Sequence, residues 1–243
     1  MKLEHEHDIA AIRARLADSN HPNYLRDWIY GGIDGAVTTF AIIAGVVGAG
    51  LQPHIIIVLG LANLLADGFS MAASNYLGTR AERDEVEKLT EMEQRHIKLA
   101  PEGERSEIRE ILRSKGLEGK VLDEAVQAIT SNPRTWVNVM LAEEHGVSRQ
   151  QRSPLMSAAS TFAAFAICGA VPLAPFVIGG DAAFHWASIL VGITFFAIGA
   201  AKSLWSLAPW WRAGLETLAV GASAAALAYG VGHLLQGFAP GFP

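Results

Sequence analysis

Five apolar segments, each long enough to cross a membrane, constrain the fold of this chain more than any other feature. A helix needs roughly 20 apolar residues to span the hydrocarbon. The segments are Trp28–Leu51, Ile55–Leu77, Leu155–Ile178, Ala182–Leu204 and Trp211–Leu235. In a soluble protein, these segments would have to be five buried helices, each longer than an ordinary helix, and this argues against a soluble fold. The sequence therefore predicts an all-α membrane protein with five transmembrane helices, the third ended or kinked by Pro172 and Pro175.

Charged residues lie mainly in two regions, Met1–Asp27 and Arg80–Arg152, and this distribution predicts the topology. Basic residues also flank the connection between spans four and five, at Lys202 and Arg212, whereas the turns after spans one and three contain none. By the positive-inside rule, we expect the amino terminus and the insert between spans two and three to be cytoplasmic. The predicted parts are a cytoplasmic segment 1–27, transmembrane helices 28–78, a cytoplasmic helical metal-binding domain 79–152, and transmembrane helices 153–243.

Composition excludes several other classes of protein. The net charge is -5 and no basic stripe with interleaved aromatic residues occurs, so we expect no nucleic-acid partner. The single cysteine, Cys168, rules out a disulfide framework or a cysteine-based zinc site within one chain. Residues Met1–Asp18 are charged and lack the apolar core of a cleavable signal peptide.

The insert is predicted to be helical throughout. Thr79–Leu99 contains no helix breaker, so span two should continue into the insert as one long helix. Three shorter helices are expected after it, at Glu102–Ser114, Glu118–Thr130 and Arg134–His145. These helices carry few large apolar residues, and such a thin bundle favours support from a second chain. We therefore expect a homodimer.

Two acidic residues, Asp34 and Asp67, interrupt the first and second apolar segments. A carboxylate within hydrocarbon is costly and usually marks an ion or substrate path. These positions therefore indicate a membrane transporter for a cation. An alternative is a structural role, in which Asp34 and Asp67 pair with Lys202 or with backbone groups.

Within the insert, Glu, His and Met recur at one-turn spacing and would share a helix face. The pairs are Glu93 with His96, Glu104 with Glu107, and Met140 with Glu144. Carboxylate, imidazole and thioether groups on facing helices suit a divalent transition metal. One alternative is a solvated face paired with nearby arginines. Another is a membrane-tethered di-iron oxidase or iron sensor, because Glu-x-x-His also suits di-iron chemistry.

Two further runs lie in the apolar segments, Gly31–Ala41 (GGIDGAVTTFA) and Gly60–Ala72 (GLANLLADGFSMA), the second followed by Tyr76–Leu77. Both runs closely resemble the signatures of the vacuolar iron transporter family. The resemblance covers essentially the whole chain. It implies a dimeric five-span transporter, not an enzyme, that moves Fe²⁺ and often Mn²⁺ out of the cytosol in exchange for protons. Zn²⁺ and Co²⁺ are further candidate ions, no prosthetic group is expected, and the expected location is a bacterial inner membrane.

The resemblance also implies residues of the transport path. Asp34 matches the family aspartate that lines the path at the dimer interface, and Met71 matches a methionine that offers its thioether to the ion. Asn63 stands where plant members have glutamate, and we take Asp67, one turn further along, as the compensating carboxylate. Asn75 stands where many members carry an acid.

For the insert, the resemblance implies a set of metal ligands that capture ions before transport. They are Glu93, Glu104, Glu107, Met140 and Glu144. His96 falls where plant members have glutamate, which keeps a ligand but removes a negative charge. The resemblance therefore leaves the balance among Fe²⁺, Mn²⁺ and Zn²⁺ open.

Overall fold

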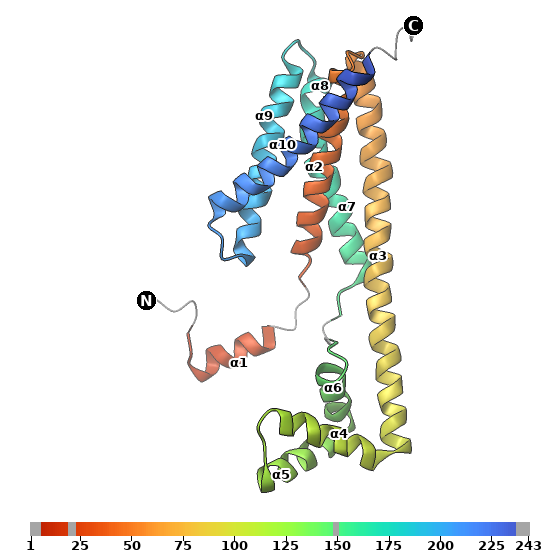
Figure 1. Ribbon diagram of the computed structural model, residues 1–243, viewed down its shortest axis with the longest axis vertical. Coiled ribbons are helices and arrows are strands. Elements are labelled where there is room, and N and C mark those ends of the chain that lie inside the picture. Colours follow the sequence, from red (N-terminus) through yellow and green to blue (C-terminus); the bar gives the residue numbers. More distant parts are fainter. Residues whose placement is uncertain (1–5, 19–22, 148–150, 237–243) are drawn as a thin grey trace. The chain divides into compact units, whose positions relative to one another are not determined.

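The structure is a computed structural model that describes residues 6–18, 23–147 and 151–236, and these residues form helices joined by turns (Figure 1). The helices are α1 (Ile9–Asp18), α2 (Leu25–Gly48), α3 (Pro53–Leu99), α4 (Pro101–Ser114), α5 (Gly119–Thr130), α6 (Pro133–Glu143), α7 (Pro154–Ala170), α8 (Ala174–Ile178), α9 (Ala183–Lys202) and α10 (Trp210–Leu235). Short 3-10 turns lie at Val171–Leu173 and Ser203–Trp205. The described residues form two compact units, a membrane unit (23–77 and 154–236) and an insert unit (6–18, 78–147 and 151–153).

Among the residues that the structure describes, five helical segments are long and apolar enough to cross a membrane, in agreement with the five predicted spans. The third is broken as its prolines predict, because a 3-10 turn at Pro172 separates α7 from α8. The second span continues without interruption into the insert, so α3 is 47 residues long. This continuity also agrees with the sequence, which has no helix breaker between Thr79 and Leu99.

In the membrane unit, α2 is the central helix and packs against α7, α9 and α10 (Figure 1). Small residues allow this close approach, since a Cβ added at Gly35 would lie 2.3 Å from the carbonyl oxygen of Phe165 on α7. Around these contacts lies an apolar core that includes Phe40, Ile43 and Phe195. Close packing at small residues is the usual way in which membrane helices associate.

The span of α3 carries many exposed apolar side chains, including Leu65 at 67% and Phe69 at 70% exposure. One face of the same span packs inward, where Leu64 is buried in the core. The exposed face is therefore available to lipid or to a second protein chain.

The insert unit has its own apolar core, formed by α4, α5 and α6 with Ile97 of α3 packed against it. Its buried members are Ile108, Leu112, Leu122, Val126, Trp136 and Met140. Proline occupies the first turn of α4 and of α6, and the Asn132 side chain accepts hydrogen bonds from the backbone N–H groups of Arg134 and Thr135. These start signals help to explain why the limits of α4, α5 and α6 agree with the predicted limits to within two residues.

Candidate functional site

The insert unit contains a cluster of carboxylates and imidazoles that comes from three helical segments. Ligand atoms of Glu93, His96 and Glu104 lie within 4.8 Å of one another, and so do those of Glu93, Glu144 and His145. Glu93 belongs to both groups. It lies on α3 with His96, while Glu104 lies on α4, and Glu144 and His145 follow α6.

Two of these carboxylates are buried, Glu93 with 1% and Glu104 with 5% of its surface exposed. The Nε2 atom of His145 lies 2.9 Å from Oε1 of Glu93, and Nδ1 of His96 lies 3.5 Å from Oε1 of Glu104. The other oxygen of each carboxylate, Oε2, is buried without a hydrogen-bond partner. A buried charged oxygen without a partner is costly, and a bound cation would compensate for it.

Charge repulsion accompanies this burial. Burial is the largest cause, and with the negative charges of Glu107, Glu93 and Glu144 it raises the pKa of Glu104 to about 7. The pKa of Glu107 is also raised, by burial and by Glu144 and Glu93, against the opposing effect of His96 and His145. Glu107 therefore lies within electrostatic reach of both groups. A divalent cation would relieve the repulsion.

The structure thus brings together four of the six predicted insert ligands, Glu93, His96, Glu104 and Glu144, and the charge of a fifth, Glu107, acts on Glu104. The sixth, Met140, is fully buried and packs in the apolar core of the insert. His145 joins the cluster although residue spacing did not single it out. The sequence predicts it as the last residue of the helix Arg134–His145, whereas α6 ends at Glu143 and His145 lies in the turn that follows. Its sequence signal is its position next to Glu144.

The alternative of a solvated acidic face paired with arginines fits other residues better. Arg105 pairs with Glu102, Arg109 with Asp123 at 2.6 Å, and Arg113 with Glu110. These partners are all largely exposed and lie outside the cluster. Such exposed pairs contribute little to stability. The arginines of α4 therefore pair with residues other than Glu104 and Glu107.

In the metal-free protein, we expect the insert to lose stability as the pH rises. The pKa of Glu104 is higher in the folded state, about 7, than its ordinary value of 4.5. Folding therefore favours the protonated carboxyl, so the stabilisation is complete below about pH 4.5 and is lost as the pH rises through about 7. Each pKa unit corresponds to about 1.4 kcal/mol, so the loss amounts to a few kcal/mol at most. Amide exchange in α4 of the full chain, corrected for intrinsic rates, measures this change.

The control is Glu104→Gln, whose amide does not titrate. Its exchange-derived stability should depend much less on pH, and a divalent ion should protect the wild-type α4 at high pH. Equal pH profiles for the two proteins would contradict the prediction.

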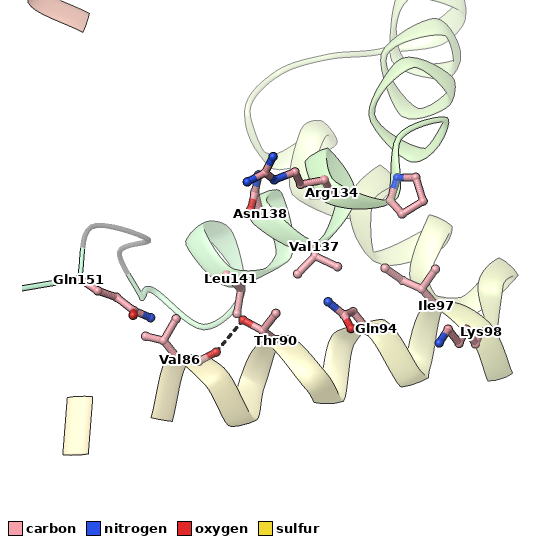
Figure 2. A pocket seen from close by; sticks show the side chains of 11 residues that line it. Val86, Thr90, Gln94, Ile97, Lys98, Arg134, Val137, Asn138, Leu141 and Gln151 are labelled. Atoms are coloured by element: carbon pink, nitrogen blue, oxygen red, sulfur yellow. Dashed lines mark hydrogen bonds between the residues drawn. The ribbon is translucent and has the colours of Figure 1, made fainter. Parts of the chain in front are cut away.

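A separate cavity of about 690 Å³ lies between α3 and α6 within the insert unit. Val86, Thr90 and Gln94 of α3 line it opposite Val137 and Leu141 of α6 (Figure 2). The Thr90 hydroxyl donates to the carbonyl oxygen of Val86 at 2.6 Å and is therefore already satisfied. The remaining lining residues, among them Lys98 and Arg134, include no carboxylate. The cavity therefore lacks the ligands that a metal cation needs.

The membrane unit holds the second set of predicted residues. Asp34 on α2 is half-buried and Asp67 on α3 is exposed, and the charge of Asp67 acts on Asp34. The Asn63 amide donates to the Thr38 hydroxyl at 3.2 Å, and Thr38 in turn donates to the backbone carbonyl of Asp34. Two adjacent spans thus bring two carboxylates and a chain of polar groups together.

Met71, also predicted for the path, is half-buried and packs against the apolar core of the membrane unit. A further polar network was not foreseen from the sequence. Asp27, in the first turn of α2, is 5% exposed, and the Asn75 amide donates to it at 3.0 Å and to the Thr161 hydroxyl at 2.7 Å. This network joins α2, α3 and α7.

Comparison with known proteins agrees with these features. Residues 25–233 match the model of the VIT family. The chain is 33% identical over 248 residues to the vacuolar iron transporter of Toxoplasma gondii, covering 95% of this chain and 82% of that protein. It is 32% identical over 216 residues to vacuolar iron transporter 1 of Arabidopsis thaliana, covering 87% and 86%. It is 30% identical over 215 residues to vacuolar iron transporter 2 of rice, covering 87% of each.

Proposed function

This chain belongs to the VIT family, and from that premise we propose that it transports Fe²⁺, and also Mn²⁺, out of the cytosol in exchange for protons. The observation that carries the proposal is the pair Asp34 and Asp67, two carboxylates on two helices that are apolar enough to cross a membrane. Carboxylates within a membrane span are costly, and those that occur usually mark an ion or substrate path. The names of the relatives supply the cargo, iron.

The proposed orientation follows from the basic residues. Lys and Arg are concentrated in the amino-terminal segment, the insert and the connection between α9 and α10. The positive-inside rule then favours a cytoplasmic amino terminus and insert. The membrane that we propose is the inner membrane of a bacterium. Metal would enter the path from the cytoplasmic side.

A homodimer is part of the proposal because Asp67 is exposed in the single chain. Its neighbours Leu65 and Phe69 are exposed as well. In a single chain, the carboxylate would therefore lie on a face that contacts lipid. A charged residue at the centre of a bilayer costs at least roughly 2.5 kcal/mol. A second copy over this face would shield Asp67 from lipid and enclose the path between the two chains.

The proposed mechanism has two steps. In the first, the cluster around Glu93 and Glu104 captures divalent ions from the cytosol and raises their local concentration. In the second, Asp34 and Asp67 take up a partly dehydrated ion, with the Met71 thioether as a further ligand. Protonation of the carboxylates from the far side releases the ion, because a neutral carboxyl no longer offsets the cost of desolvating it.

The test is metal flux in proteoliposomes loaded with a buffer of chosen pH. If protons and metal share Asp34 and Asp67, an acidic lumen should accelerate Fe²⁺ uptake, and uptake should raise the pH of the lumen. A proton ionophore should abolish the acceleration. Flux without any response to the pH gradient would indicate a channel, and absence of flux with oxidation of Fe²⁺ would favour a membrane-tethered oxidase.

The capture step predicts a change in apparent affinity and little change in maximal rate. Replacing Glu104 and Glu107 together by alanine should raise the apparent KM for metal and reduce the number of ions bound by the full chain. Transport at saturating metal should survive, because Asp34 and Met71 are unaltered. A titration of flux against metal concentration measures both quantities.

The matched control replaces Glu102 and Glu110 by alanine on the same helix, because these side chains are exposed and pair with arginines. This control should leave the KM unchanged. Loss of flux at saturation in the Glu104 and Glu107 double variant would place the insert in the transport path itself.

A further inference from the structure

The two groups of ligands in the insert share one residue, Glu93, and each contains one imidazole. His96 accompanies Glu93 and Glu104 in the first group, and His145 accompanies Glu93 and Glu144 in the second. A carboxylate has two oxygens and can join two metal ions, as in helical di-metal proteins. The Oε1 atom of Glu93 faces His145, whereas its buried Oε2 has no hydrogen-bond partner.

We propose that His145 is a metal ligand and that Glu93 bridges two divalent ions, each bound by one imidazole. The first ion would lie among Glu93, His96 and Glu104, and the second among Glu93, Glu144 and His145. The proposal rests on the function proposed above, since it concerns the same capture site. It adds a residue outside the expected ligand set and defines how the donors are divided between the ions.

The backbone holds His145 in place for this role. Its N–H donates to the carbonyl oxygen of Met140 at 3.3 Å, and the N–H of Val147 donates to that of Leu141 at 3.0 Å. Gly146 between them has a φ of 65°, in the left-handed region that glycine favours after a helix. The chain therefore turns at the end of α6 and directs the imidazole toward Glu93 on α3.

Three donor atoms converge at the second position. The Nε2 atom of His145 lies 2.9 Å from Oε1 of Glu93 and 4.0 Å from Oε2 of Glu144. Without a metal, the imidazole can hydrogen-bond to Glu93. With a metal between them, the lone pair of a neutral imidazole and the carboxylate oxygens would all point at the ion.

This ligand set has a consequence for selectivity. Imidazole suits Zn²⁺, Fe²⁺ and other transition metals, whereas Mn²⁺ is better matched by carboxylate, carbonyl and water oxygens. One imidazole per ion should therefore shift the insert toward Zn²⁺ relative to Mn²⁺. Removal of His145 should reduce this preference.

The experiment uses the full chain in detergent, with Zn²⁺ as the probe at two equivalents per chain. X-ray absorption counts the imidazoles bound to zinc, and a competition titration gives the Kd of each ion and the preference over Mn²⁺. In His145→Ala, we expect the mean imidazole count to fall by about half and one Kd to weaken by at least about tenfold. His233→Ala in α10 is the control and should match the wild type.

A second variant separates a ligand from a positioning residue. Gln at position 145 can still donate a hydrogen bond to Glu93 but is a poor zinc ligand. His145→Gln should therefore behave like His145→Ala. An unchanged imidazole count in either variant, or wild-type zinc affinity in His145→Gln, would overturn the proposal.

Iron flux of the same proteins in liposomes separates this inference from the proposed function. If the wild type transports iron but zinc ligation does not depend on His145, the inference fails and the proposed function stands. If zinc ligation depends on His145 but the wild type transports no metal, the proposed function fails and the site stands.

Discussion

Asp34→Asn should reduce metal flux by more than about a hundredfold. The reason is that the passing ion loses its charge interaction with the carboxylate, and removing one partner of a buried charge pair costs roughly 3–5 kcal/mol. The amide has nearly the same shape as the carboxyl but carries no charge, so it cannot offset the desolvation of a divalent ion. Removing this charge also relieves its repulsion with Asp67. The variant should therefore fold and assemble as well as the wild type.

The measurement is initial flux in proteoliposomes, normalised to protein that elutes as a single species and has wild-type circular dichroism. Asp181→Asn is the matched control, since it makes the same chemical change in the exposed turn before α9. Flux of Asp181→Asn should equal that of the wild type. Wild-type flux in a correctly folded Asp34→Asn variant would remove Asp34 from the path.

The sequence predicted the helices well because their signals are local. Length and apolar content define a membrane span, and proline at Pro101 and Pro133 marks a helix start. The first span differs in its limits, since α2 begins at Leu25 and ends at Gly48, three residues earlier at each end than predicted. This shift brings Asp27 into a helix, where packing rather than hydropathy determines its burial.

The site was only partly predictable because its residues meet through tertiary packing. Spacing identifies pairs on one helix, such as Glu93 with His96, but does not specify which face of α4 will meet α3. His145 is the last residue of a predicted helix, but it lies in the turn after α6, next to Gly146 with its positive φ, and only this turn brings it to Glu93. Met140 has the spacing of a ligand and also packs in the apolar core of the insert, so its role as a metal ligand stays a prediction. Periodicity alone does not separate a core residue from a ligand.

Gly35→Ala should strongly destabilise the membrane unit, although it adds one methyl group to a helix interior. The added Cβ would lie 2.3 Å from the carbonyl oxygen of Phe165 and 2.8 Å from its Cα, and backbone atoms cannot rotate away as a flexible side chain can. Helices α2 and α7 would have to separate, and overpacking of this kind costs typically 1–3 kcal/mol and sometimes more. The expected result is a lower thermal midpoint and less monodisperse protein in detergent.

Gly78→Ala is the matched control because Gly78 also lies within a helix, α3, and a Cβ there would meet nothing within 4 Å. Its effect should be neutral or stabilising by about 0.5–1 kcal/mol, the ordinary preference of a helix interior for alanine over glycine. The pair therefore compares one methyl group in a tight crossing with the same group in open space. Stability must be measured before flux, since a displaced α2 would also move Asp34, the neighbouring residue. Equal thermal midpoints for the two variants would show that α2 and α7 can separate at no cost, and the glycines of the first-span run would then need another explanation.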